Sequence, residues 1–374
     1  MPSVFFYISG HGFGHTVRQN AIINALGKRL PGVDLVISTS APRRLFDEYL
    51  RVPYTFIERP NDTGVVQIDS VRLDAPATIA LASEFYRTLG SRAEAEAAEL
   101  RERDARLVIS DAPPLACAAA AVAGVPSVVV ANFSWDCIYE GYESELHAAP
   151  DLLPMIRDAY SQAREGWRLP LHGGFATVPN VRDLPFVARH ARPDRSRDDV
   201  RRELSLPRDR PLALVSFGGY GVEGLDMAAL SRIDPWGLLM TSTTPMDGRT
   251  LGERGRTGSL IPLDEPGMYA RGFLYEDIVH AMDVVVSKPG YGIIAECVAN
   301  QTALLYTSRG HFAEYDVLVA GLPRVLRAGF IDHDALFAGR WLPYLDSLLA
   351  QPAPPERPRV DGADVAAALL LDMM

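Results

Sequence analysis

The chain is poor in lysine and cysteine, and these shortages exclude several functions. Lys28 and Lys288 are the two lysines among 37 basic residues, and 47 acidic residues bring the net charge to −10. With a pI near 5.3, a nucleic-acid groove is not expected. The three cysteines have no metal-ligand spacing, which predicts neither a zinc site nor a disulfide framework. They fit a reduced, cytoplasmic protein.

The sequence also lacks the patterns of several enzyme classes. It contains no G-x-x-x-x-G-K-[ST] phosphate loop, no G-x-S-x-G nucleophile elbow and no H-E-x-x-H zinc motif. The sole D-x-D, Asp332-His333-Asp334, lies far from any expected strand end and is interpreted as a helix cap. We therefore expect no metal and no tightly bound cofactor. Because the chain opens with a strand, no signal peptide is expected either.

No hydrophobic run is suited to crossing a membrane. The longest, Leu115–Ala131, contains Gly124 and Pro126, so it predicts a helix, a turn and a strand instead. Peripheral membrane contact stays open, although no basic amphipathic face stands out.

Strand and helix signals alternate through all 374 residues, 48% of which are hydrophobic. This length predicts two domains, and strands that are apolar on both faces predict parallel sheets covered by helices. We expect an α/β protein of two Rossmann-like doubly wound domains facing a cleft. The expected divisions are residues 1–190, residues 191–350 and a C-terminal tail helix within 351–374.

Two further segments are interpreted from their composition. Residues 77–103 predict one long helix, since Glu and Arg alternate at i,i+4 spacing. Residues 188–211 combine arginine, aspartate and proline, and we interpret them as an interdomain connector in preference to an anionic-lipid patch.

The most informative stretch is residues 284–296, VVVSKPGYGIIAE. A short strand ends at Lys288, the turn Gly290-Tyr291-Gly292 follows, and a helix then carries Glu296. Such a turn directs unpaired backbone N–H groups and the positive end of the helix dipole at one point, which suits a phosphate. Lys288 would add a cation, and Glu296 would accept hydrogen bonds from sugar hydroxyls. The combination predicts a nucleotide-sugar pocket.

Two other strand ends in the second half support this pocket. Gly218-Gly219-Tyr220-Gly221 follows an expected strand and predicts a second oxyanion cradle, the alternative being an ordinary flexible turn. Beyond another strand, Arg309 is placed to meet phosphate and Glu314 to meet sugar hydroxyls. The alternative for Glu314 is a solvated helix start.

The first glycine loop, Gly10-His11-Gly12-Phe13-Gly14-His15, follows the first strand. Its spacing departs from the dinucleotide fingerprint G-x-G-x-x-G, and no acid ends the second strand, so NAD-type binding is disfavoured. His15 is the candidate general base, because imidazole titrates near neutral pH. His11 and Gly12 are expected to contact the acceptor. A zinc pair or a simple helix cap are the alternatives.

The remaining polar candidates follow two neighbouring strands of the first half. Asn132, Trp135 and Asp136 combine an aromatic ring with hydrogen-bonding groups, a common way to hold a sugar ring. Asp111 ends the preceding strand at the same edge. The alternative for Trp135 is core filling.

Five segments together resemble a known fold family: SGHGFGH, SDAPPLACAAAAVAGVPSVVVANFSWDCIY, FGG, KPGYGIIAE and RGHFAEY. They are similar to the GT-B glycosyltransferases, in the branch of the MurG-type N-acetylglucosaminyltransferases and glycolipid synthases. They look still more like the glycosyltransferase-like N-terminal region of plant L-arabinokinases. The segments span most of the chain in the right order.

The resemblance assigns roles to individual residues. It implies that His15 is the catalytic base and that Glu296 binds the nucleotide ribose. It places Gly218, Gly219 and Gly290 to Gly292 at the donor phosphates, and Glu314 at the donor sugar. It also implies that Phe273 and Leu274 hold the nucleobase through backbone groups. MurG-type enzymes usually have glutamines where this chain has Ala313-Glu314, so the donor sugar stays open.

The function we expect is metal-independent transfer of a hexosyl or N-acetylhexosaminyl group. The donor would be a nucleotide diphosphate sugar, UDP-linked, and the acceptor hydroxyl would belong to a small molecule, glycan or lipid. One alternative is a nucleotide-sugar 2-epimerase using Asp111, Asp136 and Glu314. Another is a non-catalytic protein that binds a sugar nucleotide. Sugar kinase activity is not expected, since no phosphate loop of that kind is present.

Overall fold

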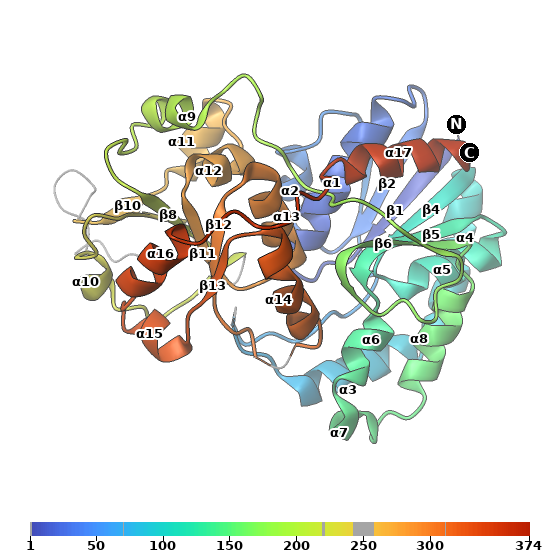
Figure 1. The fold of residues 1–374 in the computed structure, drawn as a ribbon. Coiled ribbons are helices and arrows are strands. Elements are labelled where there is room, and N and C mark those ends of the chain that lie inside the picture. The colour runs from blue at the N-terminus through green and yellow to red at the C-terminus, as the bar shows by residue number, and fades with distance from the viewer. Residues whose placement is uncertain (1, 70, 219–220, 242–257, 311) are drawn as a thin grey trace.

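Two parallel sheets, one in each half of the chain, organise the protein. The computed structural model describes residues 2–69, 71–218, 221–241, 258–310 and 312–374, and Figure 1 shows the two halves as lobes side by side. The first sheet has seven strands and the second has six. The predicted α/β architecture of two Rossmann-like lobes is confirmed.

The N-terminal lobe has the strand order β3-β2-β1-β4-β5-β6-β7, with all neighbours parallel. Its strands are β1 (Ser3–Ile8), β2 (Asp34–Thr39), β3 (Thr55–Glu58), β4 (Ala105–Asp111), β5 (Ser127–Phe133), β6 (Glu165–Gly173) and β7 (Val181–Asp183). Its helices are α1 (Phe13–Gly27), α2 (Arg44–Asp47), α3 (Ala75–Tyr86), α4 (Leu89–Glu102), α5 (Pro114–Ala123), α6 (Trp135–Glu140), α7 (Glu143–Leu146) and α8 (Leu152–Ser161). The order reverses between β1 and β4, as in the dinucleotide-binding folds.

The C-terminal lobe has the order β10-β9-β8-β11-β12-β13, again all parallel. Its strands are β8 (Leu212–Val215), β9 (Gly237–Met240), β10 (Leu260–Pro262), β11 (Val284–Ser287), β12 (Ala303–Tyr306) and β13 (Ala328–Phe330). The remaining helices are α9 (Arg197–Glu203), α10 (Met227–Leu230), α11 (Glu265–Ala270), α12 (Tyr275–Ala281), α13 (Tyr291–Asn300), α14 (Glu314–Val325), α15 (His333–Phe337), α16 (Leu342–Leu349) and α17 (Gly362–Asp372). Here the reversal lies between β8 and β11.

The central strands are buried on both faces, as their sequences predicted. Every residue of β1, β5, β8 and β11 is buried. Helices therefore cover both faces of each sheet, which a parallel sheet requires. The apolar run at 115–131 forms α5, a left-handed Gly124 and β5, as expected. Within the described residues, no helix combines the length and the apolar character needed to cross a membrane.

Three local predictions differ from the structure. The long helix expected over 77–103 is two helices, α3 and α4, because Thr88 leaves the helical conformation and its hydroxyl donates to the Phe85 carbonyl. The sequence predicts that the first helix begins at about Val17, after the glycine loop, whereas α1 begins at Phe13 and carries His15 in its first turn. Strands β6 and β7 were not predicted, since β6 carries Pro170 and β7 is exposed.

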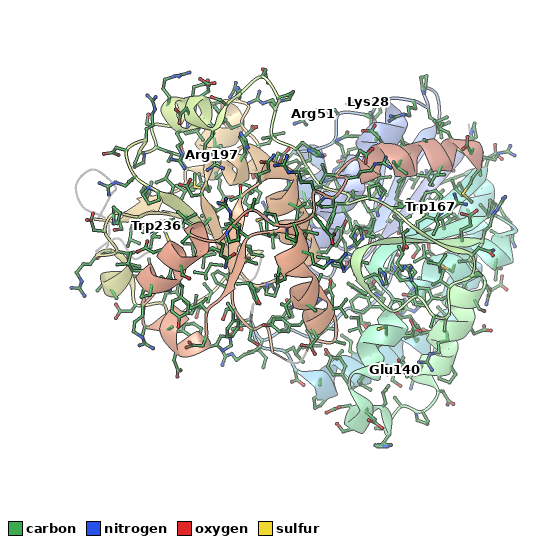
Figure 2. All side chains as sticks on the ribbon, in the orientation of Figure 1. Lys28, Arg51, Glu140, Trp167, Arg197 and Trp236 are labelled. Atoms are coloured by element: carbon green, nitrogen blue, oxygen red, sulfur yellow. The ribbon has the colours of Figure 1, made fainter. Side chains whose placement is uncertain are left out.

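The last helix returns to the N-terminal lobe. Figure 1 shows α17, in red, beside α1, in blue. Leu370 is fully buried in a hydrophobic cluster that also contains Trp167 of the N-terminal lobe, labelled in Figure 2. The predicted boundary at 190/191 falls in the segment between β7 and α9. The C-terminal tail passes beside this segment as it returns to the N-terminal lobe, and Gly362 N donates to Phe186 O there. The chain thus passes between the lobes twice.

Replacing Leu370 with alanine should destabilise the protein by about 2–5 kcal/mol, since it leaves a cavity under α17. Replacing Asp364 with alanine removes only an exposed ion pair with Arg29 and should cost about 1 kcal/mol or less. Urea unfolding of both variants measures the difference. Equal midpoints would contradict the docking of α17 as an integral part of the N-terminal lobe.

Candidate active site

The two strand-order reversals face each other across the lobe interface. In the N-terminal lobe, the ends of β1, β4 and β5 carry the His11–His15 loop, Asp111 and Asn132. In the C-terminal lobe, the ends of β8, β11 and β12 carry Gly218, Lys288 and Arg309. In parallel α/β sheets, ligands bind beyond the carboxyl ends of the strands at such reversals. Both lobes therefore present their binding edge to the same space.

A cavity of about 290 Å³ lies at this meeting point. It is lined by twelve of the residues predicted from the sequence: His11, Gly12, His15, Asn132, Gly218, Lys288, Gly290, Tyr291, Gly292, Glu296, Arg309 and Glu314. The two glycine loops touch, since a Cβ atom added to Gly292 would lie only 3.2 Å from the Gly14 Cα. The glycine at position 292 therefore permits the close approach of the lobes.

His15 is fixed from behind by a buried carboxylate. Its Nδ1 lies 2.8 Å from Asp111 Oδ1, and both side chains are almost completely buried. Arg18 Nη2 lies 2.9 Å from the same nitrogen, but a guanidinium only donates, so a proton on Nδ1 is directed to the carboxylate. Nε2 makes no hydrogen bond within the described part of the chain. It is the nitrogen available to a ligand.

Arg18 is the main functional residue that sequence reasoning missed. Its Nε donates to Asp111 Oδ2 at 2.6 Å, and Gln19 Nε2 donates to the same oxygen at 2.8 Å. Burial alone would raise the pKa of Asp111, but Arg18 and then His15 outweigh it and lower that pKa to about 2. The spacing of His15 and Arg18 was a possible signal, because residues i and i+3 of a helix share a face. This spacing is informative only if the helix already includes His15, and α1 does so because it begins at Phe13.

His11 has different neighbours and a different protonation from those expected of a base. Its Nδ1 accepts a hydrogen bond from Val65 N at 3.3 Å, and its ring stacks on Phe312 of the C-terminal lobe at 6.1 Å. Burial lowers its pKa well below the usual value, and His15, Arg309 and Lys288 lower it further. His11 is therefore neutral with its proton on Nε2, which makes it a hydrogen-bond donor rather than a base.

Two buried cations form the opposite wall of the cavity. Burial, and then the neighbouring Arg309, lower the pKa of Lys288 to about 7. The Arg309 guanidinium lies 3.8 Å from the centroid of the Phe312 ring, and its Nη1 is 3.4 Å from Glu314 Oε2. The first turn of α13, beginning at Tyr291, holds no acidic residue. This wall therefore favours an anion.

Glu314 also joins the lobes. Its Oε1 accepts a hydrogen bond from Asn132 Nδ2, and Asn132 Oδ1 accepts one from Arg18 Nη1 at 2.5 Å. Glu314 is 4% exposed, so the alternative of a solvated helix start does not hold. A continuous chain of polar contacts thus runs from Asp111 through Arg18 and Asn132 to the C-terminal lobe.

Glu296 lies in the cavity wall with an arginine from the connector against it. Arg189 Nε donates to Glu296 Oε1 at 2.5 Å. Burial raises the pKa of Glu296 to about 7, although Arg189 acts in the opposite direction. The segment 188–211 was interpreted as a connector, and nothing in its composition distinguished Arg189 from its neighbours.

Three candidates for acceptor binding do not line the cavity. Asp111 is fully buried behind His15, so its contact is with the base and not with a ligand. Trp135 is also fully buried, stacks on Tyr139 and donates its indole N–H to Asp62 at 2.8 Å. Asp136 accepts from Thr177 at 3.1 Å. The alternative of core filling describes Trp135 better than a sugar platform.

The predicted nucleobase residues serve the interior of the lobe instead. The backbone N–H of Phe273 donates to the Met268 carbonyl, and that of Leu274 donates to Asp277 Oδ2. Neither residue lines the cavity, so a nucleobase contact through these N–H groups does not fit the structure. Gly219, predicted at the donor phosphates, lies outside the described residues, as does Tyr220.

Across the described ranges, no three His, Cys, Asp or Glu side chains are grouped to hold a metal ion. Within these ranges His11 and His15 therefore lack the third protein ligand that a zinc site needs.

Comparison with known proteins identifies the fold. The L-arabinokinase of Arabidopsis thaliana is 29% identical over 376 residues, a match that covers 98% of this chain but 34% of the relative. The chain thus spans about a third of the length of that protein. No protein-family model matches the chain.

Solved glycosyltransferase structures superpose over the whole chain. The kitacinnamycin glycosyltransferase has a TM-score of 0.65 at 14% identity, covering 100% of this chain and 99% of that one. The calicheamicin glycosyltransferase CalG4 has 0.65 at 15%, covering 99% and 97%. A UDP-glucosyltransferase from Polygonum tinctorium has 0.62 at 14%, covering 99% and 93%. The chain therefore has the GT-B fold, and the resemblance seen in its sequence is confirmed.

Replacing Asp111 with asparagine should destabilise the protein by about 3–5 kcal/mol at neutral pH, because Arg18 is left buried without its counter-ion. A carboxylate with a lowered pKa stabilises the fold above its unfolded pKa and loses that effect as pH falls. The difference between wild type and variant should therefore shrink by about 2 kcal/mol between pH 5 and pH 2.

Urea unfolding across this pH range measures the effect. Asp364→Asn, at an exposed position, is the matched control and should show no such trend. A penalty for Asp111→Asn that is independent of pH would show that the carboxylate is not ionised in the fold.

Proposed function

We propose that the protein transfers a sugar from a UDP-linked donor to an acceptor hydroxyl. The observation that carries the proposal is the single cavity between the two strand-order reversals. One wall supplies a carboxylate-supported histidine, and the other supplies a helix N-terminus with two cations. Direct displacement of a diphosphate at the anomeric carbon, with inversion, uses these two elements on opposite sides of that carbon.

The C-terminal wall is the donor side of this proposal. The backbone N–H groups of the first turn of α13, together with Lys288 and Arg309, would meet the negative charge that grows on the leaving diphosphate. Because these groups are already oriented, they stabilise the transition state without reorganising. We therefore expect no requirement for a divalent cation.

The N-terminal wall is the acceptor side. Asp111 holds Nδ1 of His15, so Nε2 can take the proton from the acceptor hydroxyl. The acceptor oxygen then forms a bond to the anomeric carbon of the donor sugar, and the bond from that carbon to the diphosphate oxygen breaks. Arg18 keeps Asp111 ionised, and the carboxylate stabilises the imidazolium that forms. His11, a neutral donor, would orient a substrate oxygen.

Movement of the lobes apart would enlarge the space for substrates. The cavity of about 290 Å³ is at the lower limit for a pocket that holds one small ligand. The Asn132–Glu314 contact and the approach of Gly14 to Gly292 also lie between the lobes. Closure over bound substrates would exclude water and limit hydrolysis of the donor.

The donor is proposed as UDP-linked because the solved neighbours include a UDP-glucosyltransferase, and its sugar as a hexosyl or N-acetylhexosaminyl group. The acceptor class remains a small molecule, a glycan or a lipid. The epimerase alternative is less well supported, since Asp111 and Asp136 lie outside the cavity wall.

Replacing His15 with alanine should lower kcat by about 10²- to 10⁴-fold, because the acceptor proton loses its base. UDP affinity should stay unchanged, because His15 is on the acceptor side. UDP release from UDP-glucose and UDP-N-acetylglucosamine with an acceptor panel measures turnover, and calorimetry measures UDP binding. His147→Ala, at an exposed histidine of the same lobe, is the control.

Turnover by His15→Ala at the wild-type rate would contradict the assignment of the base. An epimerised sugar nucleotide formed without acceptor would favour the epimerase alternative. UDP binding by the wild type with no turnover on any acceptor would favour a sugar-nucleotide sensor.

Replacing Lys288 with methionine should weaken UDP binding by about tenfold or more, with little effect on uridine, since the lost charge faces the diphosphate. Lysine with a lowered pKa is charged below that pKa and loses its charge above it. The ratio of wild-type to variant affinity should therefore be largest below pH 7 and shrink as pH rises through about 7.

Calorimetric titrations with UDP and uridine between pH 6 and pH 9 test this expectation. The matched control is Lys28→Met, at the exposed second lysine labelled in Figure 2. A loss of uridine affinity equal to the loss of UDP affinity would contradict a diphosphate contact.

A further inference from the structure

Arg189 occupies a buried position between two carboxylates and two aromatic rings. Its Nε lies 2.5 Å from Glu296 Oε1 and 3.6 Å from Glu276 Oε2. Its guanidinium lies 4.4 Å from the ring centroid of Tyr49, from the N-terminal lobe, and 5.4 Å from that of Tyr275, from the C-terminal lobe. The side chain is 10% exposed, although it belongs to a connecting segment.

The backbone of this segment is fixed to α13. Val187 N donates to Tyr291 Oη at 3.0 Å, and Ala191 N donates to Asn300 Oδ1 at 3.0 Å. Asn300 Nδ2 donates in return to the Arg189 carbonyl at 3.2 Å. Tyr291 and Asn300 are the first and last residues of α13, the helix that carries Glu296. These hydrogen bonds therefore fix the position of Arg189 along the axis of α13.

The contact uses only one oxygen of the Glu296 carboxylate. Both Nε and Nη2 of Arg189 approach Oε1. Oε2 accepts no hydrogen bond from any described residue, while Glu296 lines the cavity. The arginine thus fixes the direction of the carboxylate and leaves the second oxygen to a ligand.

The charges around Glu296 make this arginine necessary. Glu276, on α12, is 5% exposed, and its Oε2 has no hydrogen-bond partner within the described residues. Burial raises the pKa of both carboxylic acids, and Arg189 is the neighbour that lowers each pKa most. Tyr275 and Tyr49, the other titratable groups facing Glu296, are neutral at physiological pH. Without Arg189, two buried carboxylic acids would face each other and Glu296 would take up a proton.

We propose that Arg189 is a positioning residue of the donor site, which keeps Glu296 as an oriented carboxylate for the ribose hydroxyls of the nucleotide. The inference rests on the proposed function and on the ribose contact of Glu296 that the sequence resemblance implies. A carboxylate accepts from two hydroxyl groups, whereas a protonated acid must use one oxygen as a donor. Arg189 thereby determines whether the site distinguishes a ribonucleotide from a 2′-deoxyribonucleotide.

The experiment compares binding of UDP and 2′-deoxy-UDP by calorimetry between pH 6 and pH 9. The ratio of the two affinities reports the ribose contact and cancels effects at the diphosphate. Wild type should prefer UDP by about tenfold or more at high pH, since a hydrogen bond to a charged group is lost. This preference should decline as pH falls through about 7, where Glu296 becomes protonated.

Three variants locate the effect. Arg189→Met should move the midpoint of the preference upward by about 1 pH unit or more, because Glu296 loses its counter-ion. Arg189→Lys keeps the charge without the fork and should fall between wild type and Arg189→Met. Glu296→Gln should show a weak preference with no pH dependence. The matched control is Arg197→Met on α9, which pairs with Asp283 at 2.8 Å, does not line the cavity and is labelled on the C-terminal lobe in Figure 2.

The outcomes separate this inference from the function it rests on. If wild type binds no UDP, the proposed function fails and the inference fails with it. If wild type binds UDP but Arg189→Met keeps the wild-type midpoint, or binds UDP more tightly, the positioning role alone is overturned. Thermal unfolding shows whether each variant is folded. If Arg189→Met does not fold, the shift expected of Arg189→Lys decides the question.

Discussion

The buried ion group of Arg18, Asp111 and His15 is the interaction on which the site depends. A carboxylate with no exposure is costly unless its charge is balanced and its oxygens are hydrogen-bonded, and Arg18 and Gln19 do both. This balance keeps Asp111 ionised, and an ionised Asp111 fixes the tautomer of His15. The same arginine reaches Asn132 and, through it, the C-terminal lobe. One guanidinium thus connects His15, the candidate base, to a contact between the lobes.

The two histidines of the first glycine loop show how little sequence separation is needed to divide two roles. His11 and His15 are four residues apart, but a carboxylate lies behind His15, whereas a backbone N–H and two cations surround His11. Burial and the neighbouring cations keep His11 neutral, whereas the carboxylate behind His15 orients that ring and leaves its Nε2 accessible. One ring is therefore suited to taking a proton and the other to donating a hydrogen bond while neutral. Each histidine follows a glycine in the same short loop, so the difference comes from the residues that the tertiary structure places around each ring.

The sequence predicted the features that neighbouring residues determine, but it did not predict the contacts between residues far apart in the chain. The strand, glycine turn and helix around Lys288 and Glu296 were predicted because their signals lie within thirteen consecutive residues. The two-lobed fold followed from the regular alternation of apolar strands and helices. By contrast, Asp111 was taken for an acceptor contact, because nothing near it in sequence shows Arg18 and His15 against its oxygens. The role of Arg189 was not predicted for the same reason, since its partners Glu276 and Glu296 lie more than eighty residues away in the sequence. The roles of Phe273 and Leu274 were carried over from a resemblance, and their N–H groups donate locally, to Met268 O of α11 and to Asp277 of α12.

Two carboxylates that would contact the donor already accept hydrogen bonds within the protein. Glu314 accepts from Asn132, and Glu296 accepts from Arg189, so neither carboxylate is left buried without a partner. Leaving such a group unpaired costs more than a hydrogen bond contributes. The Asn132–Glu314 contact runs between the lobes, so a donor that displaces it would have to offer Glu314 a hydroxyl in its place. Arg189 stays beside Glu296 and leaves the second carboxylate oxygen to another hydroxyl of the donor. A ligand that lacks one of these hydroxyls would leave a buried carboxylate unsatisfied, which discriminates more strongly than the gain of a contact does. The burial of these two carboxylates is therefore itself a source of selectivity.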